Sequence, residues 1–234
     1  MKILLIRFSS IGDIVLTTPV IRCIKRMDDD IELHVLTKDK FASLSHNNPY
    51  VDKTIEYTNS IRETIKELKK EEYDYIVDLQ KNRRSRRVCW ALGCEHHSFH
   101  KLDFQKMLLT TFKINKLPDV HIVDRYFEAV EPLGVKNDGR GLDFYISETN
   151  MMQEPDIPEE FRNGFYAIVV GGSYNTKVMP AEKVIEIIEK LDEPVILLGG
   201  PGDMQRAKVI ADAVGENVWN PVGMLNLEQS DRKS

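Results

Sequence analysis

The sequence predicts an α/β fold of two domains, each built on a parallel sheet. Short apolar runs rich in β-branched residues alternate with amphipathic stretches, as in βα units. The same rhythm restarts after one polar interruption, and 234 residues suffice for one large or two small domains. At 42% hydrophobic and 29% charged residues, the composition is that of a folded chain.

Charge and cysteine usage narrow the function classes. A formal net charge of −5 gives no support to nucleic-acid binding, because that partner is a polyanion. The first apolar run has four residues, too few for a signal-peptide core or a membrane span. The three cysteines lack C-x-x-C spacing. We therefore expect a cytoplasmic protein without a disulfide framework.

The first domain opens with a clear βα unit. Residues 2–7 predict a strand, residues 8–13 a turn and residues 14–27 a helix, which Pro19 should bend because it removes a backbone donor. Ser60 and Glu63 have the spacing of a capping box at the start of a later helix. The other expected elements are strands at 31–36, 53–57 and 73–79, and helices at 41–44, 60–70, 84–92, 104–112 and 123–133.

A polar stretch with two prolines, residues 148–163, predicts a linker between domains at 1–147 and 164–234. The second domain should contain strands at 166–170, at 194–198 and near 218, helices at 181–191 and 203–214, and the start of a helix at 225–230. Three strands are fewer than a sheet usually has, and parallel strands are normally covered on both faces. We therefore expect the second sheet to be incomplete, loosely packed and partly exposed.

The turn after the first strand is the first candidate site. Ser9, Ser10, Gly12 and Asp13 lie where open α/β sheets bind ligands, and backbone N–H groups at a helix start favour anions. Asp13 is ionised at neutral pH and can accept a proton from a substrate hydroxyl. Capping the helix is the commoner role of aspartate at such a position. From these residues alone the cap is favoured.

Two glycine-bearing loops in the second domain form another candidate site. In residues 171–177, Thr176 and Lys177 can hold a diphosphate, although Lys177 lacks the neighbours of a P-loop. In residues 198–203, Gly200 permits close approach of a ligand, and Asp203 can bind a ribose hydroxyl or cap the next helix. An ordinary glycine loop with a solvated lysine is the alternative. Neither loop is G-x-G-x-x-G, which argues against a dinucleotide cofactor.

A basic cluster follows the strand at 73–79. Its members are Lys81, Arg83, Arg84, Arg86 and Arg87. Arginine pairs well with phosphate, so the cluster can attract an anionic acceptor or anionic lipid head groups. A solvated helix face is the ordinary alternative.

No metal site is predicted. The residues that suggest one are Cys94, His96, His97 and His100, and their spacing fits no common zinc site. Cys89 is expected in the core, as free cysteines often are.

Taken together, these segments resemble the heptosyltransferase family of glycosyltransferases, family 9. The similar segments are KILLIRFSSIGDIVLTTPVIRCIK, YDYIVDLQKNRRS, GGSYNTKVMPAEKVIEII, LLGGPGD and PVGMLNLEQS. The resemblance extends over essentially all of residues 1–230, and the opening segment with its Ser-Ser-x-Gly-Asp turn is the most specific part. Met179 stands where the family has tryptophan before a proline. The family's later Asp-Thr-Gly-x-x-His segment does not occur, so we expect a C-terminally truncated chain.

The resemblance implies a GT-B fold of two Rossmann-like, doubly wound domains, the second incomplete. It implies an inverting transfer of heptose from ADP-heptose, or a related sugar nucleotide, to the lipopolysaccharide inner core, without metal or cofactor. The N-terminal domain would bind the lipid A–core acceptor and the C-terminal domain the donor. Peripheral contact with the inner membrane is compatible with this activity.

The resemblance also assigns residues. Asp13 becomes the general base that deprotonates the acceptor hydroxyl. The implied acceptor-binding residues are Ser9, Ser10, Gly12, Arg83, Arg84 and Arg86, and the implied donor-binding residues are Thr176, Lys177, Gly200 and Asp203. Two alternatives stay open: an inactive fragment that still binds acceptor, and a non-catalytic nucleotide-binding or membrane-peripheral module.

Overall fold

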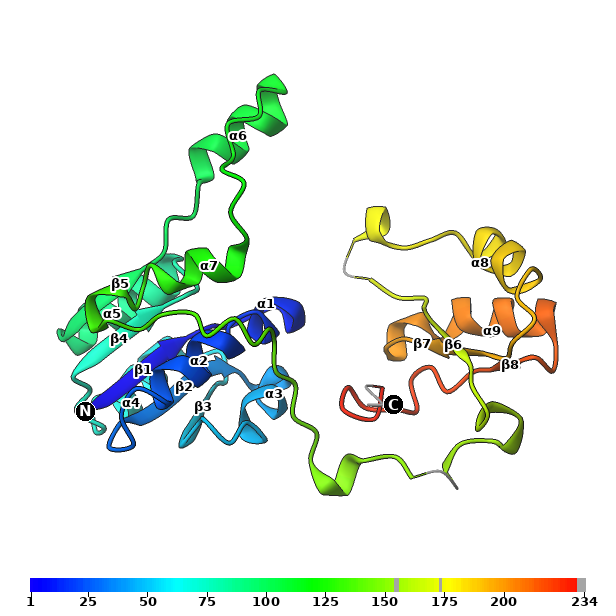
Figure 1. The fold of residues 1–234 in the computed structure, drawn as a ribbon, viewed down its shortest axis with the longest axis horizontal. Coiled ribbons are helices and arrows are strands. Elements are labelled where there is room, and N and C mark those ends of the chain that lie inside the picture. Colours follow the sequence, from blue (N-terminus) through cyan, green and yellow to red (C-terminus); the bar gives the residue numbers. More distant parts are fainter. Residues whose placement is uncertain (154–155, 173, 231–234) are drawn as a thin grey trace. The chain divides into compact units, whose positions relative to one another are not determined.

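The computed structural model of the chain describes residues 1–153, 156–172 and 174–230 (Figure 1). The chain divides into two compact units, Met1–Tyr145 (unit 1) and Ile146–Ser234 (unit 2). Both units are built on parallel sheets, as the alternating pattern predicts. Within the described residues, no helix combines the length and apolarity needed to span a bilayer.

The sheet of unit 1 has the strand order β3-β2-β1-β4-β5. Its strands are β1 (Lys2–Ile6), β2 (Glu32–Lys38), β3 (Lys53–Tyr57), β4 (Tyr75–Asp78) and β5 (Glu95–Ser98). The central strand β1 is fully buried from Ile3 to Ile6, the uninterrupted apolar run that a parallel sheet covered on both faces requires. The sequence analysis did not predict β5, because the edge strand EHHS has no apolar residue.

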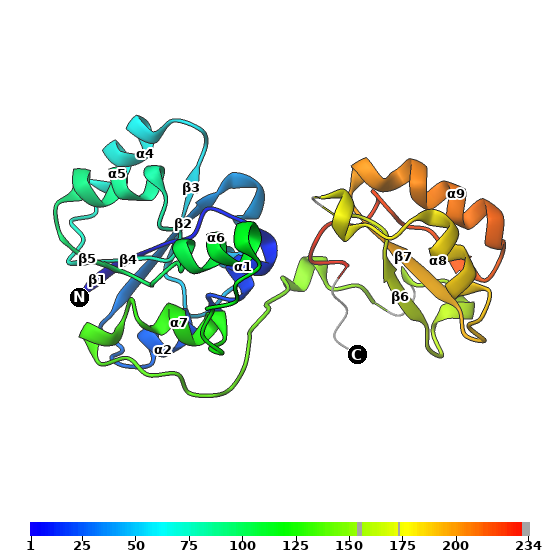
Figure 2. The same cartoon turned by 90° about the horizontal axis from the view of Figure 1, so that it is seen from above.

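Helices cover both faces of this sheet (Figure 2). They are α1 (Ile11–Val15), α2 (Thr18–Lys25), α3 (Ser43–His46), α4 (Ile61–Leu68), α5 (Arg83–Leu92), α6 (Asp103–Phe112) and α7 (Ile122–Phe127), with 3₁₀ turns η1 (Asp39–Phe41) and η2 (Glu131–Leu133). Helices α2 and α7 pack on one face and α4 and α5 on the other. Helix α6 stands apart from both layers and buries no residue (Figure 1).

The single helix predicted at 14–27 is wrong, because the chain forms α1 and α2 in its place. The break falls at residues 16–17, just ahead of Pro19. Pro19 occupies the first turn of α2, where no intrahelical N–H bond is needed. The proline therefore starts a helix instead of bending one.

A buried arginine holds the irregular end of unit 1 against α2. Arg22 donates to both carboxylate oxygens of Asp138, at 2.9 and 2.7 Å, and to the Gly141 carbonyl at 3.1 Å. It also pairs with Asp143. The Arg22 hydrogen bonds hold the pKa of Asp138 far below its usual range, so the contact stays ionic. A segment without regular structure thus gains a fixed position.

Unit 2 contains a smaller sheet of order β6-β7-β8. Its strands are β6 (Tyr166–Val169), β7 (Val195–Leu198) and β8 (Val218–Trp219), its helices α8 (Ala181–Ile188) and α9 (Met204–Val214), and its 3₁₀ turns η3 (Glu148–Asn150), η5 (Glu159–Phe161), η6 (Asn175–Lys177) and η7 (Pro201–Asp203). Both α-helices pack on the face that carries Val195 and Leu197. Each new strand is added on the same side of the previous one, in the order β6, β7, β8. Because βαβ crossovers are right-handed, the connecting helices of such a series all lie on one face of the sheet.

The other face of this sheet is covered without an α-helix. Ile196 and Trp219 on this face pack with Ile157, Phe161 and their neighbours from the polar stretch before β6. Strand β6 remains at the edge, with Val169 67% exposed, which agrees with the expected exposure of apolar surface.

The predicted helix start at 225–230 is a turn within the described residues. Asn226 and Gln229 exchange backbone-to-side-chain hydrogen bonds of 2.9 Å, the reciprocal pairing of a helix N-terminus. The side-chain pairing of a helix N-terminus is present, but no helix follows it up to Ser230, so the predicted helix start is wrong within the described residues.

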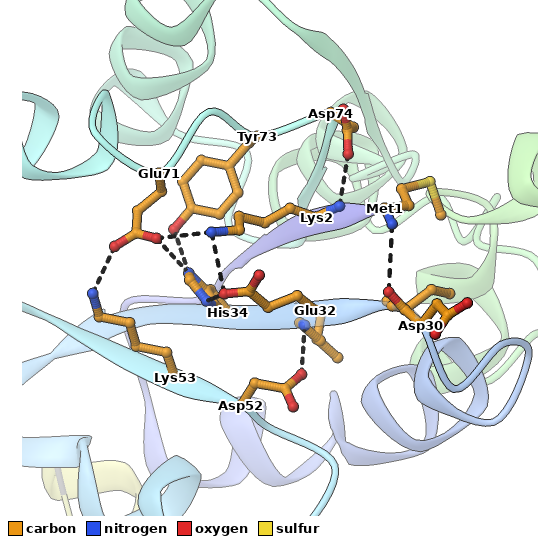
Figure 3. Close-up of polar contacts among 12 residues, drawn as sticks. Met1, Lys2, Asp30, Glu32, His34, Asp52, Lys53, Glu71, Tyr73 and Asp74 are labelled. Atoms are coloured by element: carbon orange, nitrogen blue, oxygen red, sulfur yellow. Dashed lines mark hydrogen bonds and ion pairs between the residues drawn. The ribbon is translucent and has the colours of Figure 1, made fainter.

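A polar network joins the amino ends of the strands of unit 1 (Figure 3). Lys2 Nζ lies 3.1 Å from both Glu32 Oε1 and Glu71 Oε2, and Lys53 Nζ lies 2.6 Å from Glu71 Oε1. Buried His34 contacts Glu32 Oε1 and the Tyr73 hydroxyl, each at 2.8 Å. The network connects β1, β2, β3 and the segment before β4 at the edge opposite their carboxyl ends.

Glu71 lies between two ammonium groups, and this predicts a pH-dependent contribution to stability. Hydrogen bonds from Lys53 and Lys2 lower the pKa of Glu71 from 4.5 to about 2. A folded-state pKa below the unfolded value means stability that is present above pH 4.5 and lost as the pH falls toward about 2. We expect Glu71→Gln to lower the free energy of unfolding by about 1–2 kcal/mol at neutral pH.

Urea denaturation between neutral pH and pH 3 measures this difference. The gap between wild type and Glu71→Gln should narrow with falling pH, while Glu72→Gln, at the exposed neighbouring position, should track the wild type throughout. A gap of constant size would show that the ionised carboxylate is not the cause.

Candidate functional site

The candidate site of unit 1 lies where the strand order reverses direction. Strand β1 pairs with β2 on one side and with β4 on the other, and Ile6 lies opposite Asp78 at their carboxyl ends. Open α/β sheets bind ligands at such a point, because the loops after the two strands diverge to opposite faces and leave a crevice. The loop after β1 and the loop after β4 therefore define the site.

Arg7 fixes both loops and is the residue that the sequence analysis missed. It is buried, and its Nε donates to the Ser9 carbonyl at 2.9 Å. A second nitrogen donates to the Leu79 carbonyl after β4, and a third lies 2.9 Å from Asp13 Oδ2. A lone charge at the end of an apolar strand was the available signal, since a buried guanidinium needs partners.

Asp13 lies inside α1 and not ahead of it, so its predicted place at the helix start is wrong. The N-cap position belongs to Ser10. Asp13 Oδ2 accepts from the Ser10 backbone N–H at 3.1 Å and from the Ser10 hydroxyl at 2.9 Å, the reach-back half of a capping box. Asp13 thus helps to cap the helix, as anticipated, but from the third helical position and not from the N-cap position.

The same contacts set the protonation of Asp13. Burial raises the pKa of this carboxyl, but the Ser10 backbone N–H and the charge of Arg7 outweigh burial and hold the pKa below its usual value. All three contacts fall on Oδ2, and no described residue bonds to Oδ1. The side chain is 40% exposed. Asp13 is therefore an ionised carboxylate with one oxygen free for a ligand.

Asp78 shapes the loop after β4. Its Oδ1 accepts from the backbone N–H groups of Gln80 and Lys81 at 3.0 and 2.8 Å, and its Oδ2 accepts from the Ser85 hydroxyl at 2.7 Å. The Gln80 side chain then accepts from the Phe8 backbone N–H at 2.8 Å. The Asp-Leu-Gln run therefore connects this loop to the one that carries Asp13.

The predicted basic residues begin helix α5 from this loop. Arg83 and Arg86 are exposed, and no described residue forms an ion pair with either. Arg84 instead places its guanidinium 5.6 Å from the centre of the Tyr57 ring. Arg83 and Arg86 thus keep their charges available to an anion, whereas Arg84 also has a packing role.

The predicted acceptor residues of the β1 turn lie together around Asp13. Ser10 and Gly12 are exposed and Ser9 is half-buried. A Cβ built on Gly12 would meet nothing within 4 Å, so the turn is open to solvent on this side.

The candidate donor residues of unit 2 lie in the loops after β6 and β7. Thr176 and Lys177 are exposed, with Lys177 Nζ 5.8 Å from the centre of the Tyr174 ring. Asp203 Oδ2 accepts from the Gly200 backbone N–H at 3.0 Å. This bond matches the turn-and-cap alternative for Asp203. The carboxyl ends of neighbouring parallel strands adjoin, so both loops lie at one edge of the sheet.

Asp203 also joins these two loops. A Cβ on Gly171 would fall 2.0 Å from Asp203 Oδ2, and one on Gly199 would fall 3.2 Å from it. The loop after β8 belongs to the same assembly, because Gly223 donates its backbone N–H to the Gly199 carbonyl at 3.3 Å. A side chain at 171 would therefore displace the Asp203 carboxylate.

Within the described residues, one group has metal-ligating atoms close together. It consists of Glu32, His34 and Glu71, whose ligand atoms lie within 4.8 Å of one another, at the amino ends of the strands. Lys2 and Lys53 already bind the two carboxylates. The prediction that the chain has no metal site stays a prediction.

The histidines near β5 have other partners. The His97 ring stacks on Tyr75 at 5.5 Å between ring centres, and His100 Nδ1 lies 2.8 Å from Glu128. Cys89 is buried, as expected, and burial raises the pKa of its thiol to about 12, which suits a core residue and not a nucleophile.

The amino-acid sequence of the chain is similar to those of known proteins. A family model described as "Glycosyltransferase family 9 (heptosyltransferase)" matches residues 61–232. The chain is 26% identical over 223 residues to lipopolysaccharide heptosyltransferase 1 of Campylobacter coli. It is 22% identical over 223 residues to lipopolysaccharide heptosyltransferase 3 of Escherichia coli K12. These alignments cover 85% and 81% of this chain but 64% and 60% of the relatives.

Solved structures show the fold. A glycosyl transferase of family 9 from Veillonella parvula matches with a TM-score of 0.76 at 20% identity, over 97% of this chain and 71% of that one. The ADP-heptose LPS heptosyltransferase II of E. coli matches with a TM-score of 0.72 at 18% identity, over 98% of this chain and 75% of that one. The predicted fold class, an α/β GT-B fold of Rossmann-like units, is confirmed.

The close approach of Asp203 to Gly171 predicts a selective effect of added methyl groups. Gly171→Ala forces the Asp203 carboxylate away from its bond with Gly200 and should lower the free energy of unfolding by about 1–3 kcal/mol. Gly202→Ala, in the same loop, meets nothing within 4 Å and should change it by less than about 0.5 kcal/mol. Thermal unfolding compares the two variants, and equal effects would contradict this account.

Proposed function

The chain belongs to glycosyltransferase family 9, the heptosyltransferases, and we propose that it carries the acceptor-activating part and the diphosphate-binding loops of a heptose transfer in lipopolysaccharide synthesis. The proposed donor is ADP-heptose or a related sugar nucleotide, and the proposed acceptor is the lipid A–core. The observation that carries this proposal is the Asp13 carboxylate, ionised, half-exposed and with Oδ1 free, at the reversal point of the first sheet.

The proposed reaction is a direct displacement with inversion. The acceptor hydroxyl attacks the anomeric carbon, the bond from that carbon to the diphosphate oxygen breaks, and ADP leaves with the electron pair. Asp13 Oδ1 accepts the hydroxyl proton as the new bond forms. Because the Ser10 backbone N–H and the Arg7 charge hold the pKa of Asp13 below its usual value, the carboxylate is a weak base, so proton transfer should accompany bond formation and not precede it.

The donor side rests on the loops of unit 2. Lys177 would neutralise the diphosphate and Thr176 would donate a hydroxyl hydrogen bond to it, and both side chains are exposed. Gly200 leaves room for a nucleotide at the end of β7. Asp203 would act mainly by holding these loops together, since its Oδ2 already accepts from Gly200. An E. coli heptosyltransferase of the same fold, with a TM-score of 0.66, was solved with ADP.

The acceptor side rests on unit 1. Ser9 and Ser10 would donate to acceptor oxygens beside Asp13. Arg83 and Arg86 would meet the phosphates of a lipid-linked acceptor, because neither has an ion-pair partner among the described residues. An acceptor of this kind lies in a membrane, so we include peripheral membrane contact in the proposal.

Asp13→Asn should abolish transfer while the protein stays folded. The amide keeps the shape of the side chain but cannot accept the proton, so turnover should fall by about two to four orders of magnitude. ADP release and product mass, with ADP-heptose and a core acceptor that lacks heptose, measure it. The control is Asp29→Asn, at an exposed turn before β2, which should retain wild-type turnover. Equal rates in Asp13→Asn and wild type would reject Asp13 as the base.

Lys177→Ala should weaken ADP binding by about tenfold or more, because a charged hydrogen bond to the diphosphate is lost. Calorimetric titration with ADP measures the affinity, and Lys190→Ala, at an exposed position after α8, serves as the control. Unchanged affinity in Lys177→Ala would remove this residue from the donor site.

The same measurements separate the remaining alternative. Binding of acceptor and ADP without turnover, and unaltered by Asp13→Asn, would identify the 234-residue chain as a binding module instead of an enzyme.

A further inference from the structure

Helix α6 exposes large apolar side chains that the transfer reaction does not use. None of its residues is buried, with Phe104 65% and Phe112 61% exposed. Met107 in the helix and Ile114, two residues beyond its end, are also exposed. These four apolar side chains therefore contribute none of the hydrophobic stabilisation that most helices gain by packing against a core. The helix projects clear of the sheet and its covering helices (Figure 1).

The exposed residues form one face. Exposed Phe104, Met107, Thr111 and Phe112, with half-buried Leu108, recur at intervals of three and four residues, which places them along one side of a helix. The other side carries Asp103, Lys106 and Thr110, with half-buried Leu109 among them and Lys113 at the end. This is the pattern of an interfacial helix, apolar on one face and bearing lysine on the other.

The charge of the surrounding segment indicates which partner the apolar face of α6 binds. Residues 81–116 contain nine Lys and Arg and two Asp and Glu, a local charge of +7 in a chain whose net charge is −5. Helix α5, within the same segment, carries Arg83, Arg87 and Trp90 at helical spacing, with Trp90 80% exposed. A tryptophan among basic residues suits the boundary between head groups and acyl chains. A second copy of this surface would repel the first, whereas an anionic bilayer attracts it.

We propose that α6 inserts its apolar face into the surface of an anionic lipid bilayer. Phe104, Met107 and Phe112 lie at the head-group and acyl boundary, while Lys106 and Lys113 bind anionic head groups. This deepens the proposed function, because a lipid-linked acceptor lies in such a surface. Vesicle binding needs no sugar donor, so a failure here and a failure of transfer are distinguishable.

Co-sedimentation of the full chain with vesicles tests the proposal. The chain should bind vesicles of phosphatidylcholine with phosphatidylglycerol and bind pure phosphatidylcholine at least about tenfold more weakly. Phe104→Ser with Phe112→Ser should weaken binding to the anionic vesicles by about tenfold or more. Lys106→Gln with Lys113→Gln should weaken it by about fivefold for each charge removed.

Matched controls distinguish binding through the apolar face of α6 from non-specific binding of the chain to vesicles. Val209→Ser with Met224→Ser removes two exposed apolar side chains of unit 2, and Lys69→Gln with Lys70→Gln removes two exposed charges after α4. Both should bind as wild type does. Circular dichroism checks that every variant keeps its helices.

A direct readout of depth completes the test. In Phe112→Trp, brominated lipids should quench the new tryptophan more strongly than they do the wild-type fluorescence. Equal binding by the α6 variants and their controls, or no quenching at 112, would overturn the proposal. Self-association through α6, detected by sedimentation without lipid and lost in the phenylalanine double variant, would also overturn it and assign the face to a second copy.

Discussion

The bonds of one guanidinium determine the arrangement of the first unit's carboxyl edge. Arg7 directly follows the central strand and is buried, so its nitrogens need hydrogen-bond partners from the protein. It binds the carbonyl of Ser9, the carbonyl of Leu79 and the carboxylate of Asp13. The turn after β1, the loop after β4 and the first helix consequently share one anchor. The ion pair with Arg7 orients the Asp13 carboxylate and, together with the Ser10 backbone N–H, lowers its pKa.

The two units differ because of the direction in which their strands advance. In unit 1 the chain reverses after β3 and crosses back to β4, so helices cover both faces and a crevice opens between β1 and β4. In unit 2 the described strands advance one way, and irregular chain covers the second face. The glycine loops of unit 2 therefore depend on one another, through Asp203 against Gly171, for their shape.

Periodicity predicted most of the fold, and the positions of polar residues and glycines after the strands predicted part of the site. Strands such as β3 were found to the residue, since β-branched runs between turn residues have few alternative readings. The edge strand β5 was missed because its residues are polar and only backbone pairing holds it. The partners of Arg7 and Asp203 come from distant loops, and no local pattern encodes such contacts. Pairing across 72 residues, as between Arg7 and Leu79, appears only in the folded chain.

Asp13 serves the fold and the proposed chemistry with different oxygens. Oδ2 closes the capping box with Ser10 and pairs with Arg7, while Oδ1 has no partner among the described residues. Natural selection for a well-formed first helix alone would retain aspartate here, even in a lineage whose turnover had ceased. The persistence of this residue among descendants would then reflect selection for folding. Evolutionary loss of activity would appear first at positions such as Lys177, whose side chain forms no hydrogen bond or ion pair with the described residues.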